Sequence, residues 1–249
     1  MIGIPNAFIQ TRVEDEKDMA IIKIRGILFY VLVDLAPDVY KELFTTDKKG
    51  VKKLVAQCQN SLYGTMVASL LYYRKFVNSL TYIGFVLNPY DPYVANKVIG
   101  GSQMTIFFCV DDCKLSHKSS RQMDRMIKYL RKEYESIFED SSGKMTVKRG
   151  KVHEYLGMTI DYSKPGQAKV TMLNYVEEIL TDFAKSDPKA TGTKSSAAPE
   201  NLFLVNEECE KLSTNKSVQF HNFVAKTLYA NKRARPGTCT AVALLTTRV

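Results

Sequence analysis

Residues 105–116 constrain the fold more than any other part of the sequence. An apolar run ending at Val110 meets two adjacent acids, Asp111 and Asp112, and apolar character then resumes. β-Branched and aromatic residues favour strands, and a polar break between two such runs is typical of a β-hairpin. The sequence therefore predicts an antiparallel hairpin that carries two carboxylates at its tip.

Elsewhere the pattern changes to helical spacing, so the predicted fold class is α+β. Residues 119–138 place apolar side chains on one helical face, and Ser119 with Gln122 can form a capping box. Further helices are predicted at 66–80, 174–183 and 218–231. Strands are predicted as a pair at 19–24 and 27–33, between Gly143 and Gly150, and at 152–162 and 169–172. Residues 185–201 have little to bury and predict a linker.

Composition limits the class of protein. With 249 residues, 45% hydrophobic and 24% charged, the chain is of ordinary globular composition, which excludes collagen-like, mucin-like and wholly disordered proteins. The longest apolar run, residues 27–33, is too short to span a bilayer, and no basic-then-apolar leader opens the chain. We therefore expect a soluble, intracellular and cytoplasmic protein that is not secreted and has no membrane partner. Five cysteines, an odd number, fit a reducing compartment.

A surplus of positive charge favours polyanionic partners. Thirty-five Lys and Arg against 26 Asp and Glu give a formal net charge of +9. This charge attracts nucleic acid in a way that added salt weakens. The basic cluster around Gly50 fits either a solvated hairpin tip or a phosphate contact, and it consists of Lys48, Lys49, Lys52 and Lys53.

A zinc site is the less favoured interpretation of three potential ligands. Cys109, Cys113 and His117 recur at intervals of four, which on a helix would align them on one face. Because Cys109 lies in a predicted strand, this spacing does not bring the three side chains together. His153 and His221 have no ligand-spaced partners and are expected to be surface or packing residues.

The adjacent acids point to a divalent cation. Two unit charges about 4 Å apart repel by roughly 4 kcal/mol at an effective dielectric of 20, so Asp111 and Asp112 need a compensating cation. With a third acid from a neighbouring strand they would form the oxygen-rich cage that magnesium prefers, and two such ions can assist phosphoryl transfer. The alternative interpretation is a plain polar turn.

Several short blocks accompany the acid pair. Residues 108–112 (FCVDD) lie between 61–64 (SLYG) and 155–158 (YLGM), and further blocks are 4–9 (IPNAFI), 174–180 (NYVEEIL) and 232–236 (KRARP). In this order they resemble the Ty1/copia-type reverse transcriptase domain of retrotransposons, and the resemblance spans nearly the whole chain. It implies a palm, which is an antiparallel sheet backed by helices, with partial fingers and thumb.

The resemblance implies roles for the residues that match. Asp111 would be a catalytic metal ligand, with Asp112 its close second, because they stand where the family has Tyr-Val-Asp-Asp. Phe8 would lie under the incoming sugar of the nucleotide and exclude a ribose 2′-hydroxyl; the alternative is an ordinary core residue. Residues 174–183 resemble a thumb helix. The primer grip would be formed by Tyr155, Leu156, Gly157 and Met158.

Three departures from the family weaken the implied activity. The family's third metal ligand is an aspartate four positions before Ala7, where this chain has Gly3. Losing one partner of a buried charged cluster costs roughly 3–5 kcal/mol, which corresponds to a hundred to several thousandfold in rate. Val67 replaces a glutamine near the nucleotide, and Gly237 replaces a helix-capping aspartate. The chain also starts close to Gly3 and stops before a ribonuclease H region, so it resembles a truncated, partly degenerate copy.

The implied function is that of an RNA-directed DNA polymerase domain, impaired in this copy. It would add nucleotides to a primer 3′-hydroxyl with two Mg²⁺ ions, acting on an RNA template, a DNA primer, their RNA–DNA hybrid and deoxynucleoside triphosphates. The implied domains are the start of the palm at 1–13, a fingers-like insertion at 14–55, the palm at 56–164, and thumb and connection at 165–249 with the linker at 185–201. The alternatives are a catalytically silent nucleic-acid-binding remnant and a chain that does not fold stably.

Overall fold

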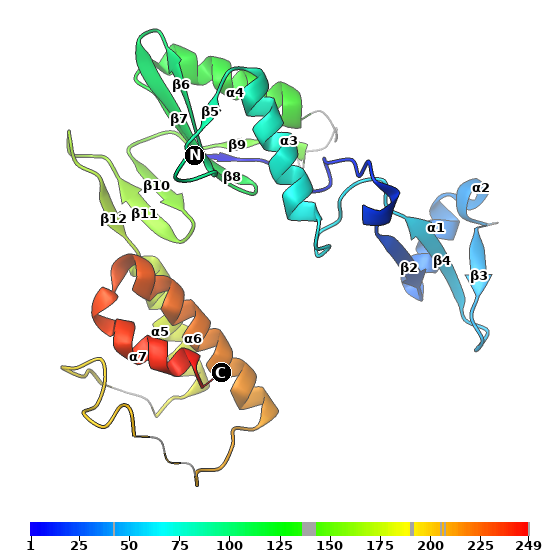
Figure 1. The fold of residues 1–249 in the computed structure, drawn as a ribbon. Coiled ribbons are helices and arrows are strands. Elements are labelled where there is room, and N and C mark those ends of the chain that lie inside the picture. Colours follow the sequence, from blue (N-terminus) through cyan, green and yellow to red (C-terminus); the bar gives the residue numbers. More distant parts are fainter. Residues whose placement is uncertain (42, 136–142, 190–191, 205, 207, 249) are drawn as a thin grey trace. The chain divides into compact units, whose positions relative to one another are not determined.

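The computed structural model describes all residues except 42, 136–142, 190–191, 205, 207 and 249. The chain divides into two compact units, Met1–Lys148 and Arg149–Val249. Both units combine antiparallel strands with α-helices (Figure 1), so the predicted α+β class is confirmed.

The first unit is built on a six-stranded antiparallel sheet in the order β5-β6-β7-β8-β1-β9. Its strands are β1 (Ile2–Gly3), β5 (Val86–Leu87), β6 (Val94–Ile99), β7 (Ser102–Cys109), β8 (Asp112–Ser116) and β9 (Thr146–Val147). Strands β7 and β8 form the hairpin predicted at residues 105–116, and β9 is the strand predicted between Gly143 and Gly150. The short strand β1 lies between β8 and β9, so the start of the chain is an interior strand of the sheet.

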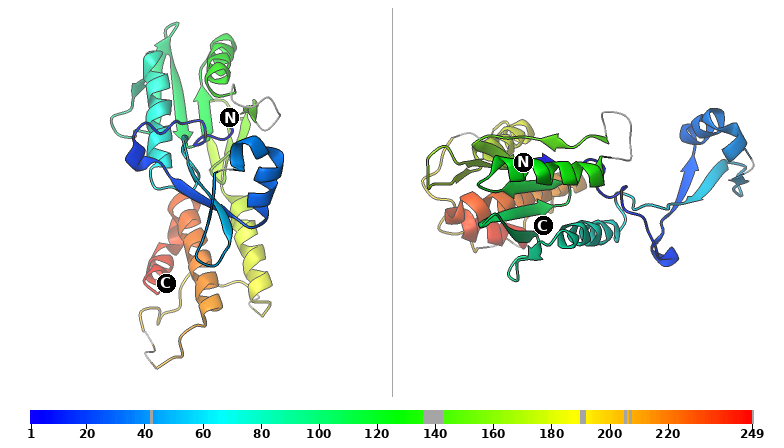
Figure 2. Two further views of the ribbon diagram at one scale, coloured as in Figure 1. Left: turned by 90° about the vertical axis from the view of Figure 1, so that its right-hand side faces the viewer. Right: turned by 90° about the horizontal axis from the view of Figure 1, so that it is seen from above.

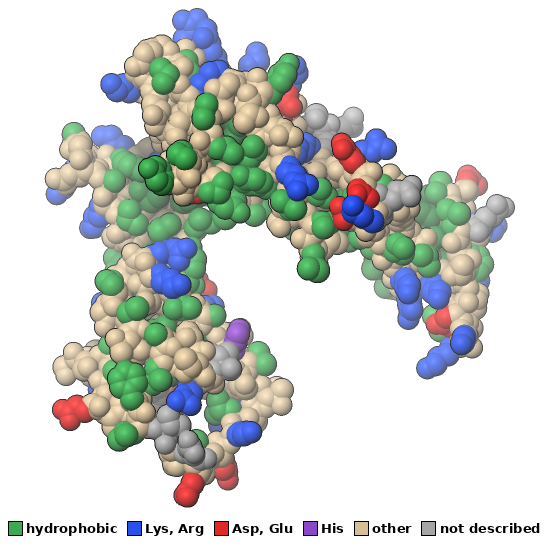
Figure 3. Space-filling model, viewed as in Figure 1, with side chains coloured by type: hydrophobic (Ala, Val, Ile, Leu, Met, Phe, Trp, Pro, Cys, Tyr) green, Lys and Arg blue, Asp and Glu red, His purple; other side chains and the backbone are tan. Residues whose placement is uncertain are grey.

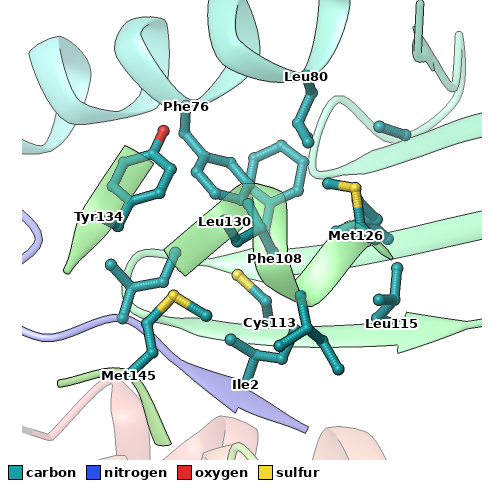
Figure 4. Close-up of a cluster of buried hydrophobic side chains, with 14 of the residues drawn as sticks. Ile2, Phe76, Leu80, Phe108, Cys113, Leu115, Met126, Leu130, Tyr134 and Met145 are labelled. Atoms are coloured by element: carbon teal, nitrogen blue, oxygen red, sulfur yellow. The ribbon is translucent and has the colours of Figure 1, made fainter. Parts of the chain in front are cut away.

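Two helices, α3 (Ala68–Tyr82) and α4 (Ser120–Tyr134), cover one face of this sheet. Strand β7 alternates as a half-buried strand should, with Met104, Ile106 and Phe108 pointing into the core. Figure 4 shows helical side chains meeting these strands, including Phe76 of α3, whose ring centroid lies 4.9 Å from that of Phe108. The opposite face of the sheet is not covered by α3 or α4, and we call it the helix-free face.

Helix α4 confirms the predicted helical period. Its buried residues are Met126, Ile127, Leu130 and Tyr134. The Ser119 side chain accepts a hydrogen bond from the Gln122 backbone N–H at 3.4 Å, so the predicted cap is present on the serine side. The predicted helix continued through Ile137 and Phe138, which lie outside the described residues. Helix α3 likewise matches the helix predicted at 66–80.

A smaller three-stranded sheet, in the order β2-β4-β3, also belongs to the first unit. Its elements are β2 (Ile21–Arg25), α1 (Ile27–Leu35), α2 (Pro37–Tyr40), β3 (Phe44–Thr46) and β4 (Lys52–Gln57), preceded by a short 3₁₀ helix η1 (Glu16–Asp18). Gly50 has a positive φ of 78° in the turn between β3 and β4. The predicted lysine cluster therefore lies at a hairpin tip, where basic side chains gather (Figure 3).

The predicted strand at 27–33 is wrong, because this segment is the helix α1. A continuous apolar run has no hydrophobic periodicity, so the pattern does not distinguish a buried strand from a helix. Gly26, with a φ of 62°, ends β2, and the distant strand β4 pairs with β2 instead. Phe29 is the buried residue of α1, and its ring centroid lies 5.8 Å from that of Phe44 on β3. Helix α1 thus packs on the β2-β4-β3 sheet, whereas the sequence predicts that residues 27–33 pair with residues 19–24 as a strand.

The second unit joins a three-stranded antiparallel sheet, in the order β10-β11-β12, to three main helices. Its elements are β10 (Val152–Tyr155), β11 (Met158–Asp161), β12 (Lys169–Thr171), α5 (Leu173–Ser186), α6 (Thr214–Ala234), a 3₁₀ helix η3 (Pro236–Thr238) and α7 (Cys239–Thr246). Figures 1 and 2 show α5, α6 and α7 side by side, in agreement with their contacts. The helices predicted at 174–183 and 218–231 correspond to α5 and α6.

Two further sequence expectations concern this unit. The single strand predicted at 152–162 is wrong, because a two-residue turn at Leu156-Gly157 divides the segment into β10 and β11. The first two residues of the linker predicted at 185–201 belong to α5, and the described residues from 187 to 201 contain no helix or strand. In the described part of the chain, no helix is both long and apolar enough to cross a membrane.

Candidate active site at the turn between β7 and β8

The acid pair lies at a tight and strained turn. Cys109 of β7 pairs with Asp112 of β8, so the connection consists of Val110 and Asp111 alone. Val110 has a φ of 53°, a left-handed conformation that glycine normally supplies in such turns. For a β-branched residue this conformation is an outlier, and outliers of this kind cluster at functional sites. Asp111 and Asp112 are both exposed.

The sheet brings Gly3 next to Asp112. Gly3 of β1 is the direct partner of Asp112 on one side and of Thr146 of β9 on the other. Residues directly opposite in an antiparallel ladder point to the same face, with Cβ atoms about 4.5–5.5 Å apart. The Ile4 backbone N–H also donates to the Asp111 carbonyl oxygen at 2.8 Å. A side chain at position 3 would therefore lie beside Asp112, next to the turn that contains Asp111.

This face is opposite to the core. The neighbouring pair, Ile2 and Cys113, is buried under the helices at 3% and 1% exposure. Successive residues of a strand alternate between the two faces, so Gly3 and Asp112 lie on the face that α3 and α4 leave free. The position that the resemblance implies for the third ligand is thus the direct neighbour of Asp112, but glycine supplies no ligand there.

The space around Gly3 is limited by one side chain. A Cβ built at Gly3 would lie 2.6 Å from Oγ1 of Thr146, which is closer than real contacts allow. The contact is with the side chain of Thr146 and not with backbone, so a side chain at position 3 requires Thr146 to move. An aspartate at position 3 therefore requires a local adjustment and not a rebuilt strand.

Partial desolvation and like charge act together on the carboxyl group of Asp112. Burial raises the pKa of the Asp112 carboxyl, the negative charge of Asp111 raises it further, and Lys148 opposes both with a smaller effect. The pKa of Cys109 is raised by burial and by the same two acids. A divalent cation at this turn would favour the ionised carboxylates and reverse the effect.

This electrostatic coupling predicts that Asp111→Asn lowers the pKa of Asp112. A carboxyl whose pKa is raised in the folded state makes the free energy of unfolding fall as pH rises from the ordinary pKa through the raised one. The fall should be smaller in Asp111→Asn, because one cause of the raised pKa is removed. Carboxyl-carbon NMR titration and urea unfolding between pH 3 and 7 measure both effects. The exposed Asp38→Asn serves as the control, and an unchanged Asp112 titration in Asp111→Asn would contradict the coupling.

Phe8 lies in an aromatic cluster with Tyr63 and Tyr72. Its ring centroid is 4.7 Å from that of Tyr63 and 6.0 Å from that of Tyr72. Burial raises the pKa of Tyr72, and the negative charge of Asp111 is one of the smaller causes of this rise. Phe8 is half-buried. It is therefore neither a fully buried core residue nor a free surface residue.

Tyr72, which packs against Phe8, has a feature that the sequence did not indicate. Its exposure is 2%, and among the described residues its hydroxyl has no hydrogen-bond partner. Helical spacing predicts that Tyr72 is buried on α3, but spacing carries no information on whether a buried hydroxyl finds a partner. The hydroxyl lies in the hydrophobic core between α3 and the sheet, so it is a buried polar group without a partner in the described part of the chain and does not face the acids.

The residues expected to grip the primer belong to the second unit. Tyr155 pairs with Met158, and Leu156 and Gly157 form the turn between them. Both turn residues have positive φ, 50° and 72°, as a type I′ hairpin requires. The four residues thus form the tip of a hairpin in the second unit, whereas Asp111 and Asp112 belong to the first.

The structure explains why the zinc-like spacing makes no cluster. Cys109 is paired with Asp112, whereas Cys113 is paired with Phe108 and buried, so the two sulfurs lie on opposite faces of the sheet. His117 receives a hydrogen bond at Nδ1 from the Ser119 backbone N–H at 3.0 Å. Within the described ranges, no group of three His, Cys, Asp or Glu side chains could hold a metal ion.

The donor set at the turn is therefore a pair of carboxylates. Two adjacent carboxylates, of which Asp112 has a raised pKa, fit one hard divalent cation whose remaining ligands are water. They do not provide the three acids that a complete two-metal site uses. The sequence comparisons add nothing to this picture: no family model, no curated protein and no solved structure matches the chain.

Proposed function

We propose that the first unit is the palm of an RNA-directed DNA polymerase domain of the Ty1/copia type, in an impaired form. One observation carries the proposal: Gly3, Asp112 and the Asp111 turn lie together on the helix-free face of an antiparallel sheet. This is the arrangement that the resemblance implies for three metal-binding acids. The second unit would supply the hairpin that grips the primer and the thumb.

Each residue of the proposed site has a stated role. Asp111 and Asp112 would hold Mg²⁺, which in such sites activates the primer hydroxyl and stabilises the leaving pyrophosphate. Phe8 would contact the sugar of the incoming nucleotide, with Tyr63 and Tyr72 fixing its ring. Contacts with the nucleic-acid backbone suit a polymerase that must accept any template sequence.

Gly3 is the reason for proposing impaired activity. The site lacks the third carboxylate, so an ion bound there would have two carboxylate ligands in place of three. The proposed chain would therefore bind one ion loosely and extend a primer slowly.

Primer extension tests this proposal. The purified chain, with an RNA template, a DNA primer, deoxynucleoside triphosphates and Mg²⁺, is expected to add nucleotides at a low rate that Asp111→Asn abolishes. Asp38→Asn, an exposed acid of α2, should leave the rate unchanged. Extension that survives in Asp111→Asn would come from another site or a contaminant, and would refute the assignment of this turn.

A catalytically silent nucleic-acid-binding protein is the second candidate. The glycine at position 3 and the formal net charge of +9 favour it. This candidate predicts salt-sensitive binding of RNA or hybrid duplex that is indifferent to Asp111→Asn and to Mg²⁺. Binding of this kind without any extension, even by a variant with the third acid restored, would select it over the polymerase.

A further inference from the structure

The tip of the hairpin between β10 and β11 has an unusual backbone. Leu156 and Gly157 both have positive φ, but only the second is a glycine. Type I′ turns favour Asn, Asp or Gly at these positions, because other residues resist the left-handed conformation. A leucine persists in this conformation only where its surroundings fix it.

Two tyrosines from the helices fix this tip. The Tyr229 hydroxyl of α6 donates a hydrogen bond to the Leu156 carbonyl oxygen at 2.6 Å. On α5, Tyr175 lies against Gly157, since a Cβ built there would be 3.3 Å from Cδ2 of the tyrosine ring. The rings of Tyr175 and Tyr229 are in contact, with centroids 5.4 Å apart. Both residues of the turn are thus held from the helical side.

Tyr229 is itself held in place by Arg233, one helical turn later. The Arg233 guanidinium lies 3.7 Å from the centroid of the Tyr229 ring. Its Nη1 also donates to the Tyr229 carbonyl oxygen at 3.2 Å. A planar guanidinium stacked on an aromatic ring restricts the rotation of that ring, and a lysine cannot replace this geometry.

We propose that Tyr229 is a positioning residue for this hairpin, and that Arg233 supports it. The inference rests on the proposed function, in which residues 155–158 grip the primer. Tyr229 does not contact the nucleic acid in this arrangement. It fixes the Leu156 carbonyl and so keeps the turn in the one backbone conformation that presents Tyr155 and Met158 to the primer backbone.

Tyr229→Phe tests the proposal, because it removes only the hydroxyl. A net hydrogen bond of ordinary strength corresponds to about a 2- to 12-fold change in an equilibrium. We therefore expect amide hydrogen exchange across residues 152–161 to accelerate by about this factor in the full chain. Arg233→Lys should give a smaller acceleration. Tyr90→Phe, at a side chain 95% exposed, is the matched control and should change nothing.

Binding of an RNA–DNA primer–template separates positioning from direct contact. Tyr229→Phe should weaken binding by about the same factor as it accelerates exchange, with the salt dependence unchanged, because no phosphate contact is lost. Unchanged exchange in Tyr229→Phe, or a smaller salt slope, would overturn the inference. If the natural chain does not bind primer–template at all, the proposed function fails, whereas the exchange result still decides whether Tyr229 holds the hairpin.

Discussion

The variant Gly3→Asp is expected to extend a primer on an RNA template about a hundred to several thousand times faster than the natural chain. The factor follows from roughly 3–5 kcal/mol for one partner of a charged cluster, at about 1.4 kcal/mol per tenfold in rate. Position 3 is the direct neighbour of Asp112 on the helix-free face, so the new carboxylate would complete the metal-binding set. Single-turnover primer extension over a range of Mg²⁺ concentrations measures the gain.

Three companion variants make this experiment decisive. Gly3→Asn has nearly the same shape without the charge and should give no gain. Gly3→Asp combined with Thr146→Ala removes the 2.6 Å contact at Thr146 Oγ1 and should match or exceed Gly3→Asp alone. Gly3→Asp combined with Asp111→Asn should be inactive. If Gly3→Asp folds, binds primer–template and still shows no extension, the polymerase assignment is refuted.

Nucleic-acid binding should depend steeply on salt. With a formal net charge of +9 and six to ten phosphate contacts, affinity for hybrid duplex should fall by about 10³ to 10⁵ between 50 and 200 mM salt. Fluorescence anisotropy with a labelled RNA–DNA duplex measures the slope. The basic β3–β4 hairpin can be tested as one source of these contacts. Replacing Lys49 and Lys52 together by neutral residues should reduce the salt slope by up to about 2, which corresponds to two lost phosphate contacts.

The matched control for this measurement replaces two acids of the first unit. Asp34→Asn with Asp38→Asn makes the chain more positive near the same sheet and should leave the number of released counterions unchanged. If the affinity of the natural chain for the duplex does not change with salt concentration, its basic residues do not contact the phosphate backbone. In that case both the polymerase and the binding-protein proposals would be excluded.

The sequence predicted those elements whose period is clear. Helix α4 and the β7–β8 hairpin follow from spacings of 3.6 and 2 residues, and both are present. The segment of α1 could not be assigned in this way, because a continuous apolar run fits a strand or a helix. In the structure β2 pairs with β4 and leaves residues 27–35 to form a helix. The paired residues are too far apart in the sequence for a local pattern to indicate this pairing.

The candidate site was predictable in its acids and not in its surroundings. Asp111 and Asp112 stand out as an adjacent pair after an apolar strand, and counting from Ala7 located Gly3. No sequence pattern indicates the positive φ of Val110 or the hydroxyl of Tyr72 that has no partner among the described residues. The hydrogen bond from Tyr229 to Leu156 joins residues 73 positions apart, so it depends on tertiary packing alone.

The interior place of β1 has a consequence for how the chain folds. Ile2 pairs with Cys113 and with Val147, so the two ladders on either side of β1 join residues 111 and 145 positions apart. Contacts between residues so far apart in the sequence form slowly, because closing the long intervening loop costs conformational entropy before the contacts stabilise it. During synthesis β1 stays unpaired until its partner strands, β8 and β9, have been synthesised and have left the ribosome. We therefore expect refolding of the first unit to be slow and prone to aggregation at high protein concentration.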